Sequence, residues 1–487
     1  MCLELHQNVF AIPVGDDFDN RVEACYLVYA PLANVFFLAL PQEIEQIKHT
    51  LRNGISTPVT QALLNSTPIS KRNPYGVGYE YASTLYLLLN EKCNFNCRYC
   101  YSAGGRSKDE MTINQMKIAL DYFLNNDRHT YPDRTVMFVG GGEPMLSWNL
   151  LKEGTEYAKK IASANNLHLK LRLSTNGSII SDKQLEYLKK NKFHVQFSFE
   201  VLEDIQKYQR GEYTQVDINL KTLLREGIHC NIRSTITIEN VDRIPEMVEL
   251  CYHNYPTIDT LLCEPVVDPN YFTSTEIVND FHTRYFKAFT KALQLANQYG
   301  ISLMSSNYGS IRLIRESFCF NLVCVTPFGT LTTCPNVSSP HEKDYDKSVF
   351  AKIEEGTIKF DDEAYKRLTA LTIHNNHKCS QCWAKWNCGA GCPNQRRVYT
   401  PEIFDATCMH YRNMLKYDLL LELSKQYYQK THKDMFTDIR EKKKITQVRL
   451  SIAAEVSQET ISAYESGKAY PSVETLIKMA DFLGTYT

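Results

Sequence analysis

The strongest constraint on the fold of this chain is an alternation of short and long segments between residues 84 and 265. The short segments are apolar or β-branched and end in glycine, proline, asparagine or acidic residues, as β-strands do. Six strands are predicted, at Thr84–Asn90, Thr135–Val139, Leu169–Ser174, Val195–Glu200, Asn231–Thr237 and Thr260–Pro265. Amphipathic helices are predicted between them, at Thr112–Asn126, Asn149–Ala164, Asp182–Asn191, Gln215–Glu226 and Val241–Tyr252. The pattern predicts an α/β fold with a parallel sheet and outer helices, either open or nearly closed into a partial (β/α)6 TIM-like barrel.

The loops after the first two strands carry the residues that best indicate a functional site. Cys93, Cys97 and Cys100 follow the first strand. Thiolates at this spacing can wrap one metal centre, and three of them leave one coordination position of a cluster open. The second strand runs into Gly140-Gly141-Gly142-Glu143-Pro144, where the glycines let a ligand approach the backbone. Both loops are expected at the C-terminal ends of the strands, which form the active-site face of such folds.

A second group of cysteines follows the predicted barrel. It comprises Cys319, Cys324, Cys334, Cys379, Cys382, Cys388, Cys392 and Cys408. Together the two groups contain eleven of the sixteen cysteines and indicate several iron–sulfur clusters. Two zinc knuckles are the rival interpretation, because cysteine-only sites suit both metals. The remaining five, Cys2, Cys25, Cys230, Cys251 and Cys263, show no ligand spacing and are predicted to be buried as small apolar side chains.

Composition narrows the class of protein further. The 487 residues include 54 basic and 55 acidic side chains, so no global field favours nucleic acid or membrane partners. No apolar run is long enough to span a membrane, and the N-terminus is unlike a signal peptide. We therefore expect a cytoplasmic protein in which metal binding, rather than disulfide formation, explains the cysteines. Four regions are predicted: an N-terminal cap or peptide-docking region (1–80), the barrel (81–305), a cysteine-rich domain (306–425) and a helical domain (433–487).

The first of these regions contains no residue pattern that indicates chemistry. Apolar and aromatic residues alternate over Val22–Leu40, which predicts a small sheet, and a helix is predicted at Gln42–Arg52. The short run Tyr29-Ala30-Pro31-Leu32 is similar to the N-termini of radical peptide maturases, where it helps to dock a leader peptide. A structural cap on the barrel is the alternative.

The cysteine and glycine motifs resemble those of radical S-adenosylmethionine (SAM) enzymes, and the second cysteine group resembles the SPASM domain of their peptide- and protein-modifying members. The resemblance implies that Cys93, Cys97 and Cys100 hold a [4Fe–4S] cluster whose fourth iron binds SAM. It places Tyr99 near the adenine and Glu143 on the methionine ammonium. Further SAM contacts are implied for Gly141, Gly142, Asn176, Ser198, Glu200 and Arg210. The run Ser198-Phe199-Glu200 departs from the family's usual Ser-x-Asp-Gly.

The same resemblance implies one or two auxiliary [4Fe–4S] clusters. Cys379, Cys382, Cys388 and Cys408 would hold one of them, and Cys392 would join Cys319 and Cys334 at the other. The family's first ligand of that second cluster normally precedes the position of Cys319, but the stretch is IRLIRES here. Either Cys324 substitutes for the missing ligand or the cluster is incomplete.

The C-terminal region resembles the helix-turn-helix of phage-repressor and Cro-like proteins over residues 435–487. Thr446 and Ser457 are predicted to cap two consecutive helices, the second of which would present Gln458, Glu459 and Ser462 to a DNA major groove. Glu455 stands where the family has glycine, and Ser451 stands at a usual alanine position. A β-carbon at a left-handed turn costs about 1 kcal/mol. DNA binding, protein docking and a vestigial role all remain open for this region, which follows the polar bridge SKQYYQKTHKD.

These features lead to one functional hypothesis and two alternatives. The chain is predicted to cleave SAM reductively to a 5′-deoxyadenosyl radical and to install a C–S or C–C crosslink in a ribosomally made peptide or protein, with an electron donor such as flavodoxin or ferredoxin. An anaerobic sulfatase-maturating-type enzyme is the first alternative, but that family has aspartate where this chain has Pro335. A redox-sensing iron–sulfur transcription regulator is the second, although a sensor has no need of a ligand like Glu143.

Overall fold

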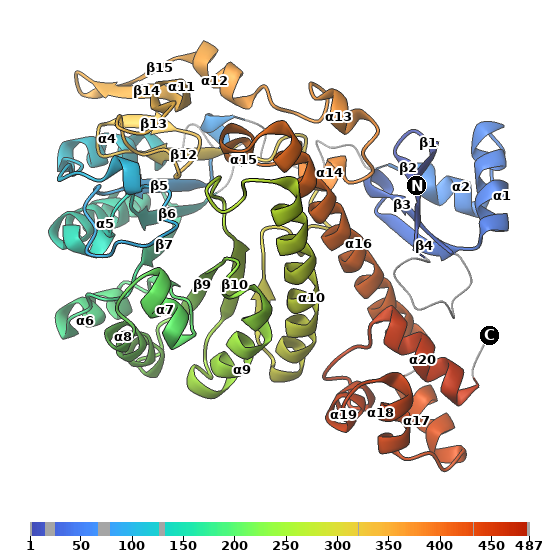
Figure 1. Cartoon of the computed structure of the whole chain (residues 1–487). Helices are drawn as coiled ribbons and strands as arrows, with labels where there is room; N and C mark the ends of the chain where they lie inside the picture. Colours follow the sequence, from blue (N-terminus) through green and yellow to red (C-terminus); the bar gives the residue numbers. More distant parts are fainter. Residues whose placement is uncertain are drawn as a thin grey trace.

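The computed structural model describes residues 2–14, 25–66, 78–125, 132–319, 321–431 and 433–484. Figure 1 shows a long twisted sheet with helices along one side, a small sheet near the N-terminus, and a helical unit at the C-terminal end. The unit is joined to the rest by one long helix, α16 (Pro401–Thr431). No helix in the described ranges combines the length and the apolar character that crossing a membrane requires.

The barrel part of the sheet consists of seven parallel strands. In spatial order they are β5 (Thr84–Leu88), β6 (Asp133–Val139), β7 (His168–Thr175), β8 (His194–Ser198), β9 (Cys230–Ile236), β10 (Thr260–Pro265) and β11 (Ser302–Met304). The predicted α/β class with a parallel sheet is therefore confirmed, and all six predicted strands are present. The short strand β11 was not predicted.

Helices cover the outer face of this sheet (Figure 1). They are α4 (Ile113–Phe123), α5 (Trp148–Ala164), α6 (Asp182–Lys190), α7 (Glu203–Gln209), α8 (Thr214–Arg225), α9 (Ile244–Asn254) and α10 (Thr275–Tyr299). Thr112 caps α4 as the sequence indicates, since its side chain accepts a hydrogen bond from the Gln115 backbone N–H. The sequence reading missed α7 and the long helix α10.

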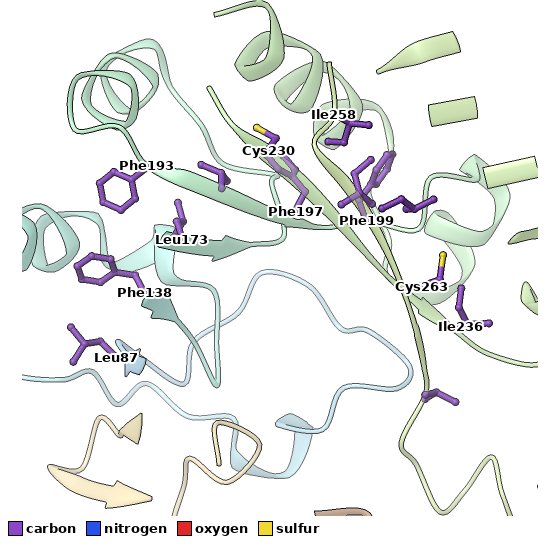
Figure 2. Packing of buried hydrophobic residues seen from close by; sticks show 14 of the residues in the cluster. Leu87, Phe138, Leu173, Phe193, Phe197, Phe199, Cys230, Ile236, Ile258 and Cys263 are labelled. Atoms are coloured by element: carbon purple, nitrogen blue, oxygen red, sulfur yellow. The ribbon is translucent and has the colours of Figure 1, made fainter. Parts of the chain in front are cut away.

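Burial alternates along each barrel strand. Leu87, Phe138, Leu173 and Phe197 point from neighbouring strands toward the helices and are fully buried (Figure 2). Except for the buried Leu88, their alternation partners on the inner face are only half-buried or exposed. This period of two is what a sheet shows when one face packs on helices and the other lines an open interior.

The same sheet continues past the barrel. Strand β12 (Leu322–Val325) pairs in parallel with β5, and β13 (Thr330–Thr332), β14 (Val349–Glu354) and β15 (Thr357–Phe360) follow in antiparallel order. Short helices surround these strands and carry the chain to α16. They are α11 (Tyr345–Ser348), α12 (Asp362–Thr369), α13 (His377–Ser380), α14 (Lys385–Cys388) and α15 (Pro393–Val398). The cysteine-rich region is thus an extension of the barrel sheet.

The N-terminal region forms the small sheet and the helix that its sequence predicts. The antiparallel strands are β1 (Leu3–His6), β2 (Val9–Pro13), β3 (Tyr26–Ala30) and β4 (Val35–Ala39), and helices α1 (Pro41–Arg52) and α2 (Pro58–Leu64) follow. Residues 22–24 of the predicted sheet segment lie outside the described residues. The sheet shares a core with α16 and the second cysteine group. Its Tyr29 hydroxyl donates to Asn387 Oδ1 (2.9 Å), and Trp386 Nε1 donates to Asn8 Oδ1 (2.8 Å). The sheet therefore packs on the cysteine-rich region. The sequence left a peptide-docking region and a cap on the barrel open, and both stay predictions.

The predicted helical domain contains, in its described residues, the helices α17 (Lys433–Lys442), α18 (Gln447–Ala454), α19 (Gln458–Glu465) and α20 (Val473–Leu483). Thr446 and Ser457 cap α18 and α19 as predicted. Glu455 adopts the left-handed conformation (φ 55°) that the family gives to glycine, and its carboxylate pairs with Lys478. Ser451 is buried, and its hydroxyl is satisfied by the Val448 carbonyl (2.9 Å).

The bridge before this unit was predicted as a polar linker, but α16 continues through it to Thr431. The unit also contacts the barrel directly. Gln298 Nε2 on α10 donates to Thr460 Oγ1 on α19 (2.7 Å), and the Ser424 hydroxyl on α16 donates to the Pro471 carbonyl. The helical unit is therefore held against the rest of the chain through the long helices α10 and α16.

Candidate active site

A cavity of about 260 Å³ opens at the C-terminal ends of the barrel strands. Among the predicted site residues it is lined by Cys93, Cys97, Tyr99, Cys100, Gly141, Gly142, Glu143, Asn176, Ser198 and Arg210. The structure thus brings together residues from four separate loops, because parallel strands end at the same edge of the sheet. Of the predicted SAM contacts, Glu200 is the one that is not among the residues lining this cavity.

The three thiols of the first group face this cavity beside two guanidinium groups. Arg106 Nη2 donates to Cys100 Sγ (3.0 Å) and its Nη1 donates to the Gly141 carbonyl (2.5 Å), while Arg210 Nη1 lies 3.9 Å from Cys97 Sγ. Burial raises the pKa of the Cys93 and Cys97 thiols, and the nearby arginines act in the opposite direction. Cationic neighbours favour the thiolate form that metal ligation requires.

Within the described ranges, no three His, Cys, Asp or Glu side chains gather closely enough to hold a single metal ion. A cluster has a different geometric requirement, because its thiolates bind different irons and therefore lie further apart than the ligands of one ion. Three thiols around one cavity, with positive charge behind them, fit a cluster of this kind.

Glu143 lies at the base of the cavity with a side chain that is almost fully buried. Its carboxylate accepts hydrogen bonds from Thr175 Oγ1 (2.6 Å), the Asn176 backbone N–H (2.7 Å) and the Met145 backbone N–H (3.0 Å). Burial nevertheless raises the pKa of Glu143, and the three hydrogen bonds act against that effect. A cation bound in the cavity would stabilise the charged form, which is what the ammonium of SAM would provide.

The glycines of the second loop have a packing role that the sequence reading missed. A Cβ on Gly141 would lie 2.1 Å from a carboxylate oxygen of Glu91, and one on Gly142 would lie 1.9 Å from the Lys92 carbonyl. The two glycines are therefore needed for this loop to pack on the segment that leads to Cys93. The sequence predicts that these glycines let a ligand approach the backbone, which would be an additional effect.

Tyr99, Glu200 and Arg210 form one buried network. The Tyr99 hydroxyl and Arg210 Nε (2.7 Å) both donate to Glu200 Oε1. The other carboxylate oxygen of Glu200 accepts from Ser234 Oγ (2.6 Å) and the Thr235 backbone N–H (3.1 Å). Glu200 is fully buried and fully engaged, so its geometry is that of a group that positions Tyr99 and Arg210.

The remaining predicted contacts lie at the strand ends. Asn176 Nδ2 donates to Asn94 Oδ1 (2.9 Å), which ties the loop after β7 to the cysteine loop. Ser198 ends β8 and lines the cavity.

Several cavity residues were not predicted from the sequence. They are Tyr86, Arg106, Thr175, Arg233, Glu264, Pro335 and Asn336. The inward positions Tyr86, Arg233 and Glu264 could have been found from strand parity, since each alternates with buried neighbours. Pro335 and Asn336 enter from a distant part of the chain, and no local pattern indicates that.

The cysteines of the second group lie in two sets. Cys319, Cys334 and Cys392 are mutual neighbours; burial raises the pKa of Cys319 and of Cys334 to about 12, and the closeness of the other sulfurs adds to the shift. Cys324 lies next to this set on β12, fully buried, with Cys334 and Cys319 nearby. The stretch before Cys319 includes Arg315, whose Nε donates to the Asn387 carbonyl (2.9 Å).

Cys379, Cys382, Cys388 and Cys408 form the other set. Burial raises the pKa of Cys388 to about 12 and that of Cys408 to about 11, with contributions from neighbouring thiols of the same set. Cys2 shares a separate cavity with Cys382, so its surroundings differ from those of the fully buried Cys230, Cys251 and Cys263. The prediction of a buried, packed thiol is confirmed for these last three, whereas Cys2 and Cys25 are half-buried at the edge of the core under the N-terminal sheet.

Comparison with known proteins identifies the class. Residues 87–251 match the Radical SAM superfamily, and residues 438–487 match the helix-turn-helix family. The chain therefore contains a radical SAM domain and a C-terminal helix-turn-helix domain.

Individual relatives are more distant. A cysteine-type anaerobic sulfatase-maturating enzyme of Clostridium novyi is 21% identical over 341 residues, which cover 64% of this chain and 88% of that protein. An uncharacterized protein of Methanocaldococcus jannaschii is 26% identical over 263 residues, covering 52% of this chain and 85% of its own length. The solved structure of native anSMEcpe with bound AdoMet and Kp18Cys peptide aligns with 69% of this chain and 97% of its own, at 16% identity and a TM-score of 0.53. This last likeness concerns the fold.

Proposed function

We propose that this protein is a radical SAM enzyme that modifies a ribosomally made peptide or protein by forming a C–S or C–C crosslink. The observation that carries the proposal is the meeting of Cys93, Cys97 and Cys100 with the buried Glu143 in one cavity. When bound there, a [4Fe–4S] cluster and SAM would supply a 5′-deoxyadenosyl radical that removes a hydrogen atom from the substrate. Distant similarity to sulfatase-maturating enzymes supports a peptide or protein substrate.

The residues of this chain would divide the work as follows. The three thiolates hold the cluster, Glu143 orients the methionine ammonium, and Tyr99 lies beside the adenine with its hydroxyl fixed by Glu200. Asn176, Ser198 and Arg210 complete the polar wall. The cavity is recessed at the end of the barrel, which limits access of competing hydrogen donors to the reacting groups.

The second cysteine group supports auxiliary clusters of the SPASM type. One set of four thiols and one set of three with Cys324 beside it match the assignment that the resemblance implies. Such clusters would accept the electron released after hydrogen abstraction. A flavodoxin or ferredoxin would deliver the first electron.

The experiment is anaerobic reconstitution with iron and sulfide, reduction with dithionite, and measurement of 5′-deoxyadenosine formed from SAM. Replacing Cys93, Cys97 and Cys100 together with alanine should abolish cleavage while the auxiliary iron is retained. Normal cleavage by the triple variant would refute the assignment. Iron rather than zinc in the purified protein distinguishes clusters from zinc knuckles.

A sulfatase-maturating activity is the competing proposal. Pro335 follows Cys334 and lines the cavity, so no carboxylate stands at the position where that family carries aspartate. The cavity does contain the carboxylate of Glu264, which accepts the Ser306 backbone N–H (3.1 Å). Incubation with a sulfatase peptide that contains the target cysteine or serine would separate the two activities, because formylglycine is detected by its mass.

We also propose DNA binding by the helix-turn-helix domain as a second activity, supported by the exposure of Gln458, Glu459 and Ser462 on α19. The full chain should retard a fragment of its own promoter with steep salt dependence, and a chain ending at residue 430 should not. The same truncated chain should still cleave SAM, because the patterned cysteines and the barrel remain. If neither form binds DNA and truncation slows peptide modification, the domain is a docking module.

A further inference from the structure

The inner face of the barrel carries a positively charged side chain that is not among the proposed SAM contacts. Five charged residues other than cysteine line the cavity, namely Arg106, Glu143, Arg210, Arg233 and Glu264. Four of them are engaged: Arg106 with Gly141 and Cys100, Glu143 with Thr175 and Asn176, Arg210 with Glu200, and Glu264 with Ser306. Within the described part of the chain, no ion pair or hydrogen bond of the Arg233 side chain is found.

Arg233 points into the interior from the middle of β9. It is exposed between the buried residues Ile232 and Ser234, and it pairs in register with Ser198 on one side and Leu262 on the other. Arg172 occupies an inward, exposed position on β7. Both guanidinium groups approach Tyr86 across the barrel closely enough to oppose the rise in the pKa of its phenol, which burial raises. Two cations therefore face the interior of the barrel, and Arg233 is the one that lines the cavity.

The carboxylate of SAM is a poor match for Arg233. The ammonium and carboxylate of SAM are attached to the same carbon, and Glu143 at the end of β6 is the proposed ammonium partner. Strand β9 is three strands from β6, a separation of roughly 14 Å along the sheet. This geometry favours Arg233 as the ligand of a second molecule in the cavity.

We propose that Arg233 is a specificity residue that binds the carboxylate of an acidic side chain close to the target residue of the peptide substrate, with Arg172 adding to the field that attracts it. A guanidinium recognises a carboxylate through two parallel hydrogen bonds, which an isosteric amide cannot reproduce. Tyr86 and Gln196 line the same cavity and supply further polar contacts. This inference rests on the proposed function for the nature of the substrate, and it can be tested without turnover.

The test uses arginine labelling by phenylglyoxal on the anaerobically purified full-length chain, followed by peptide mass mapping. The probes are acetyl-Gly-Glu-Gly-amide and its glutamine counterpart. The glutamate peptide should protect Arg233 at a concentration at least about tenfold lower than the glutamine peptide does. Arg225 is the control, since it is exposed on α8, outside the cavity, and should be labelled equally with either peptide.

Equal protection by both peptides, or no protection by either, would overturn the proposal. Protection by SAM alone would assign Arg233 to the cofactor and would overturn it as well. For Arg233→Lys we expect retained discrimination between the peptides, measured as their competition with a fluorescein-labelled glutamate peptide in an anisotropy assay. Arg233→Gln should lose the discrimination at unchanged iron content. SAM cleavage measured on the same preparation decides the proposed function separately, because the labelling result does not depend on it.

Discussion

Glu200 and Arg210 form an ion pair that is almost completely removed from water, so its contribution to the free energy of unfolding is large enough to measure. The side chain of Glu200 is 0% exposed and that of Arg210 is 9% exposed, with 2.7 Å between Oε1 and Nε. Removing one partner of such a pair leaves the other charge buried and typically costs about 3–5 kcal/mol. We therefore expect Glu200→Gln to destabilise the barrel by that amount.

Removing the arginine instead of the glutamate should lower the free energy of unfolding by less. Arg210→Met leaves Glu200 with hydrogen bonds from Tyr99, Ser234 and Thr235, so about 2–3 kcal/mol is expected. The double variant removes both charges, and its loss should fall short of the sum of the single losses by about 2 kcal/mol or more.

Hydrogen exchange on the full-length chain is the suitable assay, because several domains make a single global unfolding free energy ill-defined. Peptides that cover β8, α7 and β9 should open more easily in the single variants, while those of the helix-turn-helix domain serve as the internal control. Additivity within about 0.5 kcal/mol would show that the two side chains do not stabilise each other, and it would refute the argument.

Three further predictions concern other parts of the molecule. Cys324→Ala should lower the iron and sulfide content of one auxiliary cluster, whereas the matched control Cys230→Ala should retain all iron; unchanged iron in Cys324→Ala would identify a packed thiol. Burial lowers the pKa of His282 from 6.5 to about 3, so the unfolded chain binds more protons between these values and stability should fall as the pH falls through that window. His282→Phe should remove that part of the pH dependence, roughly 3 kcal/mol by pH 4, as followed by hydrogen exchange in α10; an identical pH slope would contradict it. Glu455→Gly should stabilise the helix-turn-helix by about 1 kcal/mol, less a few tenths for the lost Lys478 pair, while Glu455→Ala keeps the strained conformation and should gain nothing in a thermal melt.

The strands and helices of the barrel could be predicted because the residue patterns that indicate them are local in the sequence. Each strand alternates or runs apolar over five to eight residues, and caps such as Thr112 mark helix starts. The cysteine loop and the Gly141–Glu143 loop could be placed at one edge of the sheet because all parallel strands end there. The order of the strands and helices along the chain is enough to place both loops at this edge.

The rest depends on contacts that sequence spacing does not encode. The apolar strand β12 is only four residues long, and nothing in so short a run indicates which strand it pairs with, so its pairing with β5 could not be foreseen. The engagement of Glu200 with Arg210 and Tyr99 depends on how α7 returns over β8, and α7 itself was missed. The docking of Gln298 on Thr460 joins two regions whose relative position no periodicity indicates.

The pairing of β12 with β5 has a consequence for synthesis of the chain. Strand β5 is the first strand of the barrel to leave the ribosome, and β12 emerges only after the last helix of the barrel. Until then β5 presents an open edge of unpaired backbone groups beside the loop that carries Cys93. All seven barrel strands are thus synthesised before the β5 edge is paired, and that edge is exposed to misassembly during the interval. The strand that finally covers the edge also carries Cys324, so the edge beside the Cys93 loop is completed only when this member of the second cysteine group has been synthesised.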